Sequence, residues 1–173
     1  QGTKINFEFP SVGATGNIAM AAATAEGTTI IENAAREPEI VQLCEYLNTM
    51  GACIRGIGTT RLTIDGVETL RSADIDVIPD RIEAGTFLAA GALLGEITLN
   101  GVIPEHLNSV ILNFKDAGCN VSTTSNSVTI AKTDKISLFL KILKQFRFVS
   151  CMSYGSFNVK QGKSPASKSG LPP

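Results

Sequence analysis

The chain has 173 residues, the length of one ordinary domain, and 43% of them are hydrophobic, 18% charged and 6% aromatic, with no tryptophan. This composition is typical of a globular protein and excludes a fully disordered chain, a collagen and a small disulfide-dense protein. The apolar stretches are interrupted well before the roughly 20 residues of a bilayer span. No charged start followed by an apolar run stands at the N-terminus. We therefore expect neither a membrane span nor a secretory signal.

The cysteines and the charge distribution limit the possible partners. The four cysteines are Cys44, Cys53, Cys119 and Cys151. None forms a Cys-x-x-Cys pair and His106 is the only histidine, so we expect no metal site and reduced thiols in a cytoplasmic protein. The net charge is −8 over residues 1–131 and +7 over residues 132–173. A basic tail can bind nucleic acid or a membrane, but these basic residues follow no patterned motif, so we expect neither partner.

An internal repeat organises the first 131 residues. One copy runs from Asn17 to about Gly66, and the second from Ile82 to about Ala131. Matching landmarks recur 66 to 68 positions apart: Gly27 and Gly95, Pro38 and Pro104, Gly51 and Gly118, Leu62-Thr63-Ile64 and Val128-Thr129-Ile130. Such a constant register indicates a duplicated structural unit.

The first copy predicts a helix, a strand, a second helix and a hairpin, preceded by a further strand. Small residues favour a helix over Asn17–Ala25, and β-branched residues favour a strand over Thr28–Glu32. The second helix begins at Pro38, which suits a first turn, and ends at Gly51. The hairpin pairs Cys53–Gly56 with Arg61–Asp65.

The second copy predicts the same order. We expect a leading strand over Asp76–Ile78, then a helix over Ile82–Leu94 and a strand over Glu96–Asn100. A second helix begins at Pro104 and ends at Gly118, and the closing hairpin pairs residues 119–123 with 127–131. Repeated helix-strand-helix-strand-strand units predict an α/β fold with helices packed on a sheet.

Three strings of residues are recognisable. They are Phe9–Thr15 (FPSVGAT), Ala25–Val41 (AEGTTIIENAAREPEIV) and Val77–Phe87 (VIPDRIEAGTF). Together they closely resemble the UDP-N-acetylglucosamine 1-carboxyvinyltransferase family, the enolpyruvyl transferases that begin peptidoglycan synthesis. The resemblance covers about residues 5–131. The sister enzyme of aromatic amino-acid synthesis shares the fold, but we do not expect the second and third strings in it.

This resemblance implies a fold and an activity. Family members have two lobes, each an inside-out α/β barrel of three repeated units, with the active site between them. They transfer the enolpyruvyl group of phosphoenolpyruvate to the 3-hydroxyl of UDP-N-acetylglucosamine without a metal or an organic cofactor. The family chain crosses between lobes near VIPDRIE, so we assign residues 1–78 to one lobe and 79–131 to the second. Both lobes are then partial, because a full member is two to three times as long.

The resemblance also implies which residues bind substrate. The FPSVGAT turn lies against the nucleotide in the family, which assigns substrate binding to five residues: Phe9, Pro10, Ser11, Val12 and Gly13. Backbone N–H groups that run into a helix N-terminus do form anion sites, although an isolated SVGAT turn is also a plain helix cap.

Asp80 and Arg81 fall at the lobe crossing, and we assign them with Glu37 to the cleft or hinge. The alternative is that Asp80 and Glu83 cap a helix and that Glu37 merely precedes one.

The family's catalytic groups have no counterpart in this sequence. Its phosphoenolpyruvate-binding Lys-Asn pair, its reactive-cysteine loop and its aspartate in an FPTD-like turn match no motif here. We expect Cys44, Cys53 and Cys119 to be buried and His106 to lie at the surface. We therefore assign no catalytic residue and expect an inactive fragment of the transferase. The alternative is a non-catalytic remnant that binds the UDP-sugar, or an interaction module. The oligomeric state stays open.

Residues 132–173 depart from the family pattern. Ile136–Phe148 predicts a basic amphipathic helix that could contact a membrane or a partner, and residues 160–173 predict disorder. The abrupt change of charge favours a frameshift, a mis-joined exon or a decayed gene as the origin of this tail.

Overall fold

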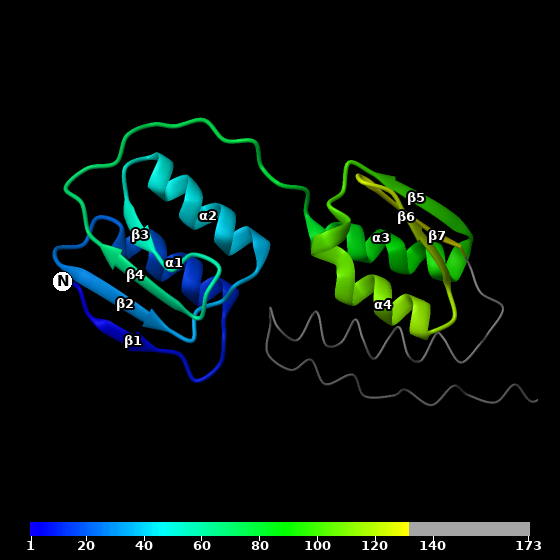
Figure 1. The fold of residues 1–173 in the computed structure, drawn as a ribbon, viewed down its shortest axis with the longest axis horizontal. Coiled ribbons are helices and arrows are strands. Elements are labelled where there is room, and N and C mark those ends of the chain that lie inside the picture. The colour runs from blue at the N-terminus through cyan, green and yellow to red at the C-terminus, as the bar shows by residue number, and fades with distance from the viewer. Residues whose placement is uncertain (132–173) are drawn as a thin grey trace, which may run out of the picture.

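The computed structural model describes residues 1–131, which form two α/β units joined by residues 66–80 (Figure 1). The first unit contains β1 (Lys4–Asn6), α1 (Val12–Ala22), β2 (Thr28–Glu32), α2 (Pro38–Thr49), β3 (Cys53–Arg55) and β4 (Arg61–Asp65). The second contains α3 (Arg81–Leu94), β5 (Glu96–Asn100), the 3-10 turn η1 (Pro104–Leu107), α4 (Asn108–Asp116), β6 (Asn120–Thr123) and β7 (Ser127–Ala131).

The two sheets have the same topology. Strands β2, β4 and β3 lie side by side in that order and are antiparallel, as are β5, β7 and β6. The first sheet has one extra strand, because β1 pairs with β2 in parallel. The repeat and the α/β class predicted from the sequence are therefore confirmed.

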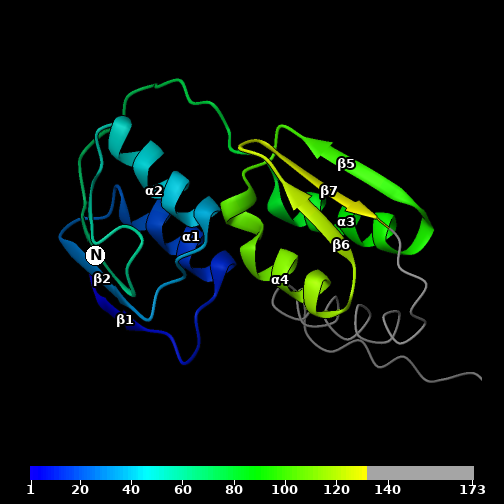
Figure 2. The same ribbon diagram turned by 45° about the vertical axis from the view of Figure 1, so that its right-hand side comes forward.

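Each unit buries its own core between the helices and one face of the sheet. Figure 2 shows α3 and α4 on the same side of the second sheet. The matched residues of the repeat occupy matched places in the cores, since Leu62 and Ile64 of β4 are as fully buried as Val128 and Ile130 of β7. Both second helices end as expected, with Gly51 and Gly118 at positive φ values of 104° and 93° after the last turn.

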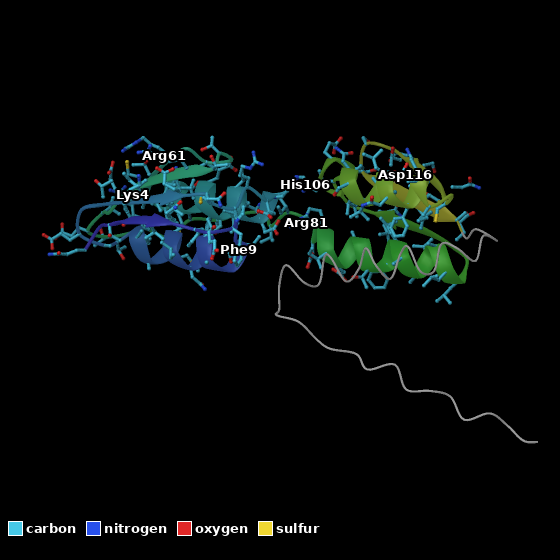
Figure 3. All side chains as sticks on the ribbon, turned by 90° about the horizontal axis from the view of Figure 1, so that it is seen from below. Lys4, Phe9, Arg61, Arg81, His106 and Asp116 are labelled. Carbon is cyan, nitrogen blue, oxygen red and sulfur yellow. The ribbon has the colours of Figure 1, made fainter. Side chains whose placement is uncertain are left out.

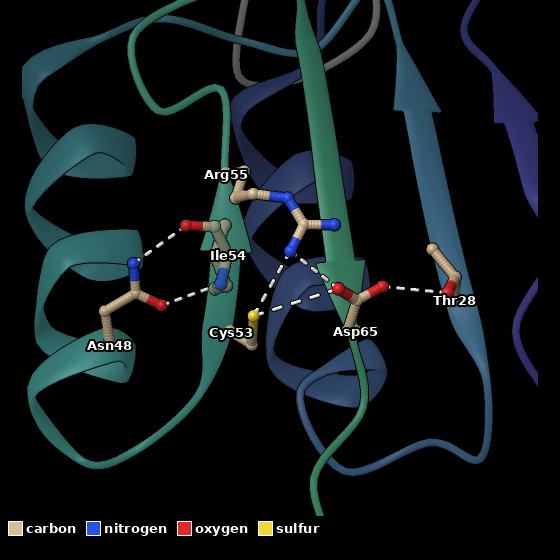
Figure 4. A network of polar contacts seen from close by, with 6 residues as sticks. All are labelled: Thr28, Asn48, Cys53, Ile54, Arg55 and Asp65. Carbon is tan, nitrogen blue, oxygen red and sulfur yellow. Dashed lines mark hydrogen bonds and ion pairs between the residues drawn. The ribbon is translucent and has the colours of Figure 1, made fainter.

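Polar side chains fix the edge of the first sheet (Figure 4). The Asp65 carboxylate accepts a hydrogen bond of 2.8 Å from the Thr28 hydroxyl on β2 and pairs with Arg55 of β3 at 2.7 Å. The Asn48 amide, at the end of α2, bonds both the N–H and the carbonyl of Ile54 at 2.8 Å. The contacts of Asp65 thus link β2, β4 and β3 with one another, and those of Asn48 link α2 to β3.

Helix α1 begins earlier than predicted, at Val12 instead of Asn17, and it ends at Ala22 instead of Ala25. The prediction was wrong because two tertiary contacts compensate for poor helix formers in the first turns. Thr15 is fully buried and hydrogen-bonded, and a Cβ on Gly16 would lie 3.3 Å from Leu43 of α2. The absence of a side chain at Gly16 thus lets the two helices approach.

The predicted strand over Asp76–Ile78 is also wrong, because residues 66–80 form no strand. Side chains of α2 occupy the backbone groups that a sheet would need. Gln42 donates to the carbonyl of Asp76 at 2.9 Å and accepts from the N–H of Ile78 at 3.1 Å, and the Tyr46 hydroxyl donates to the carbonyl of Ala73 at 3.0 Å. The linker is therefore fastened along a helix.

Two element bounds of the second copy also differ from the prediction. The helix predicted from Pro104 starts as the 3-10 turn η1 and becomes α-helical only at Asn108, and β6 begins one residue after Cys119. Within residues 1–131, no helix has the length and apolar character that crossing a bilayer requires. The predicted helix over 136–148 and the predicted disorder over 160–173 lie outside the described residues.

Candidate functional site

Ser11 shapes the N-terminus of α1. Its backbone is extended, with φ −129° and ψ 117°, and its hydroxyl oxygen accepts a 3.3 Å hydrogen bond from the N–H of Ala14. This is the geometry of an N-cap, so the helix-cap interpretation of the SVGAT string is correct. The cap satisfies one of the N–H groups that a helix start leaves without an intrahelical acceptor.

The N–H groups of Val12 and Gly13 remain available at the same helix start. They lie in the first turn, and within the described part of the chain neither donates to a protein acceptor. Gly13 is exposed, and a Cβ placed on it would have no atom within 4 Å. The first turn of α1 contains no acidic residue, whereas α2 and α3 have Glu39 and Glu83 there. The positive end of the α1 dipole is thus uncompensated and open to an anion.

Thr15 anchors this helix start to the loop before α2. Its hydroxyl donates to the carbonyl of Ser11 at 2.7 Å and accepts from the N–H of Ala35 at 3.0 Å. Because Thr15 has no exposed surface, both bonds form in the core. The N-termini of α1 and α2 are therefore held at the same end of the first unit.

Phe9 and Pro10 precede the cap and are exposed. Phe9 is 69% exposed, which is unusual for a large aromatic residue in a folded unit. The Asn33 amide, in a left-handed backbone conformation with φ 57°, donates to the carbonyl of Phe7 at 3.1 Å and so supports the segment before the turn. The exposed Phe9 thus comes three residues before Val12 and four before Gly13, whose N–H groups are available.

Arg81 and Glu39 connect the second unit to the first. The Nε and Nη2 atoms of Arg81 donate to the two carboxylate oxygens of Glu39 at 3.0 Å and 2.7 Å. Burial by itself would raise the pKa of Glu39, but the hydrogen bonds from Arg81 and from the backbone, with the positive charge of Arg81, hold that pKa below its ordinary value. The same hydrogen bond raises the pKa of Arg81, which stays charged. Figure 3 shows Arg81 between the units, with Phe9 on the first and His106 on the second.

The three residues assigned to the cleft or hinge lie at helix starts. The Asp80 carboxylate caps α3 by accepting from the N–H groups of Ile82 at 2.7 Å and Glu83 at 3.1 Å. Glu37 precedes α2 and makes no side-chain cap bond. Arg81 pairs with Glu39, a residue that sequence reasoning did not place in the site. No local signal could have found this partner, because the two are 42 positions apart.

His106 differs from the surface residue that was predicted. It is half-buried in η1, and within the described residues its Nδ1 atom is buried without a hydrogen-bond partner. It lines a narrow crevice with Pro79, Asp80, Arg81 and Val102, among others. The crevice has no room for a water molecule. It is a packing defect between η1 and the start of α3, and it offers no ligand pocket.

Two of the cysteines are buried as expected and a third is not. Burial raises the pKa of Cys44 to about 11 and also raises that of Cys119. Cys53 is half-buried, and its Sγ lies 3.4 Å from an Arg55 nitrogen on the outer face of the sheet. Cys151 lies outside the described residues. Over residues 1–131, no three His, Cys, Asp or Glu side chains gather as a metal site would require.

Comparison with known proteins places these features in a family. The family model for EPSP synthase (3-phosphoshikimate 1-carboxyvinyltransferase) matches residues 1–146, which extends past the last described residue. Relatives named UDP-N-acetylglucosamine 1-carboxyvinyltransferase include one from Chlorobium luteolum, 54% identical over 79% of this chain, and one from Chloroherpeton thalassium, 55% identical over 78%. The chain spans about a third of the length of these relatives, 32% in both cases.

A solved structure agrees with this assignment. The crystal structure of the enolpyruvyl transferase NikO from Streptomyces tendae superposes with a TM-score of 0.61 at 26% identity, covering 71% of this chain and 30% of that one. The family model, the sequence relatives and the solved structure thus all match enolpyruvyl transferases. The chain belongs to the EPSP synthase (3-phosphoshikimate 1-carboxyvinyltransferase) family of enolpyruvyl transferases.

Proposed function

We propose that this chain supplies part of the sugar-nucleotide site of an enzyme that transfers the enolpyruvyl group of phosphoenolpyruvate to the 3-hydroxyl of UDP-N-acetylglucosamine, in the cytoplasm, for cell-wall synthesis. Relatives of that name are 54% and 55% identical to it, which favours this substrate over a shikimate. Within the chain, the observation that carries the proposal is the open, uncompensated N-terminus of α1.

The N-terminus of α1 offers what a nucleotide diphosphate needs. The N–H groups of Val12 and Gly13 point out of the first turn, and the dipole adds positive potential at the same place. Hydrogen bonds to a charged acceptor are stronger than those between neutral groups. The exposed Phe9 ring gives the uracil base an aromatic surface, while Pro10 and the Ser11 cap fix the turn between them.

We assign Asp80, Arg81 and Glu37 to the hinge between the two parts of the enzyme. Arg81 follows the linker directly and binds Glu39 of the first unit, so any rotation between the units must strain or break that ion pair. Enclosure of substrate by such a movement is common in enzymes that exclude water from their reaction.

The 173-residue chain by itself binds the sugar nucleotide without turnover in this proposal. It spans about a third of its relatives, and its sequence has no motif that matches the family's reactive-cysteine loop or its aspartate in an FPTD-like turn. The binding-remnant alternative makes the same prediction for the isolated chain. The two differ only in whether the chain acts within a complete enzyme.

Calorimetric titration of the full chain with UDP-N-acetylglucosamine tests the proposal. Val12→Pro removes one N–H at a position where proline suits both the helix and the extended backbone of Ser11. We expect at least tenfold weaker binding, since a hydrogen bond to a charged group contributes about 1.5–3 kcal/mol.

Asn17→Ala, on an exposed later turn of α1, is the matched control and should bind as the parent does. Equal affinity of the parent and Val12→Pro would reject the anion site. Release of phosphate from phosphoenolpyruvate only when the sugar nucleotide is present would reject the claim of no turnover.

A further inference from the structure

Thr15 stands in the middle of a chain of hydrogen bonds that ends at the start of α1. The N–H of Ala35 donates to the Thr15 hydroxyl oxygen at 3.0 Å, and this hydroxyl donates to the carbonyl of Ser11 at 2.7 Å. The N–H of Thr15 donates to the same carbonyl at 2.9 Å. Ala35 is buried and Thr15 has no exposed surface, so water does not compete for these bonds.

The carbonyl of Ser11 and the N–H of Val12 belong to one peptide unit. Because that unit is planar and trans, its C=O and its N–H point in opposite directions within one plane. The two hydrogen bonds that fix the direction of the Ser11 carbonyl therefore also fix the direction of the Val12 N–H. This N–H is one of the two donors that the start of α1 offers to an anion.

All the donors of the chain point the same way. The N–H of Ala35 points to Thr15, the hydroxyl of Thr15 points to Ser11, and the N–H of the Ser11–Val12 peptide comes last. Hydrogen bonds that are linked head to tail in this way polarise one another, and the effect is larger where the surroundings are dry. The Val12 N–H is thus both aimed and strengthened as a donor.

The Thr15 bond differs from an ordinary back-bond of a helical threonine. Such residues often donate to the carbonyl four positions earlier without any further role. Thr86 of α3 does so, with a bond of 2.9 Å to Ile82, but it is exposed, and within residues 1–131 its hydroxyl accepts from no N–H. Thr15 is buried and accepts from Ala35, 20 positions away, so it joins two separate segments.

We infer that Thr15 is a positioning residue of the sugar-nucleotide site, an inference that rests on the proposed function. It holds and polarises the peptide unit whose N–H, that of Val12, binds the anionic diphosphate oxygens. It does so without contacting the ligand, because its side chain is fully buried. Through Ala35, the loop before α2 becomes part of the support of the site.

Calorimetric titration of the full chain with UDP-N-acetylglucosamine tests this role. Thr15→Val removes the hydroxyl and should weaken binding roughly fivefold, less than Val12→Pro, because the N–H is misdirected and not lost. Thr15→Ser keeps the hydroxyl and should restore the affinity of the parent. Thr86→Val is the matched control, because it removes a back-bond of the same kind from α3, and it should bind as the parent does.

Combining Thr15→Val with Val12→Pro shows whether Thr15 acts through the Val12 N–H. Once that N–H is absent, Thr15→Val should weaken binding no further. An equal loss in both backgrounds, or parental affinity of Thr15→Val, would overturn the inference and leave the anion site standing. Parental affinity of Val12→Pro would reject the anion site, and the inference with it.

The parent chain gives a second readout that holds even if Thr15→Val does not fold. In an NMR titration of the ¹⁵N-labelled chain with UDP-N-acetylglucosamine, the amide of Ala35 should shift with the same midpoint as that of Val12, because the chain of bonds transmits the polarisation. The amide of Gly51, at the far end of α2, should not shift. A Val12 amide that titrates while that of Ala35 stays unchanged would overturn the inference.

Discussion

Arg81 and Glu39 form a two-pronged ion pair that joins the first residue of α3 to the first turn of α2. Both guanidinium-to-carboxylate bonds are short, 3.0 Å and 2.7 Å, and the two side chains are only 27% and 39% exposed. The planar guanidinium matches both carboxylate oxygens at once. This pair, with Gln42 and Tyr46 on the linker, fastens the start of the second unit to the first.

The ion pair should contribute measurably to stability. A double-mutant cycle of Glu39→Gln and Arg81→Met, followed by urea denaturation, should give a coupling of about 0.5–1 kcal/mol, the upper range for partly exposed pairs. The same cycle on Lys4 and Glu32 is the control, because that contact is single, 3.4 Å long and 64% exposed at the lysine, and it should give almost none. Equal coupling in the two cycles would show that the two-pronged geometry is unimportant.

The contribution of Glu39 should disappear in acid. The pKa of Glu39 in the folded chain lies below its ordinary value of 4.5, so folding favours the ionised carboxylate. Its stabilisation is therefore complete above pH 4.5 and is lost as the pH falls through the lower, folded pKa. The difference in unfolding free energy between the parent and Glu39→Gln should shrink over that acid range. A difference that grows as the pH falls would contradict the assignment.

Two glycines of α3 should respond oppositely to alanine. A Cβ on Gly91 would lie 2.8 Å from Cγ2 of Ile130 and 3.0 Å from Cβ of Ile97, whereas one on Gly85 would have no neighbour within 4 Å. Gly91→Ala should lower the unfolding free energy by about 1–2 kcal/mol, since overpacking outweighs the better helix propensity. Gly85→Ala should raise it by about 0.5–1 kcal/mol. Thermal or urea unfolding of both variants decides; a stabilising Gly91→Ala would mean that α3 packs less closely on the sheet.

The buried Thr15 hydroxyl should matter more than its methyl group. Thr15→Val leaves the N–H of Ala35 without its acceptor and should cost about 1–3 kcal/mol of unfolding free energy. Thr15→Ser keeps the hydroxyl and loses one methyl group, which costs about 1 kcal/mol. Denaturation of both variants gives the comparison. A smaller loss of unfolding free energy for Thr15→Val than for Thr15→Ser would show that the hydrogen bond between Thr15 and Ala35 does not stabilise the fold.

The fold was largely predictable because its signals are local and repeated. Proline, glycine and β-branched residues set the bounds of β2, α2, β4, β5 and β7, and each signal occurs twice at a constant spacing. Contacts between distant residues had no such signal. Gln42 and Tyr46 divert the linker from the strand predicted over Asp76–Ile78, and Gly16 and Thr15 extend α1 through packing on α2.

The sequence predicted which segment forms the candidate site, but not the tertiary contacts that hold that segment in place. The FPSVGAT string indicated a helix start beside a ligand, and the structure places a cap at Ser11 with available N–H groups after it. The string could not indicate that Thr15 anchors this helix start, nor that Glu39 is the partner of Arg81. The buried Nδ1 of His106 was also unpredictable, because it depends on the packing of η1 against α3.

An NMR titration of the ¹⁵N-labelled full chain with UDP-N-acetylglucosamine tests the central claim most directly, because it observes individual amides. The account predicts saturable shifts at the N–H groups of Val12 and Gly13, a smaller shift at Phe9, and none at Gly51, at the far end of α2. N-acetylglucosamine without its nucleotide diphosphate should leave Val12 and Gly13 unshifted. Saturable shifts confined to other residues, or no shifts at millimolar ligand, would contradict a nucleotide site at the N-terminus of α1.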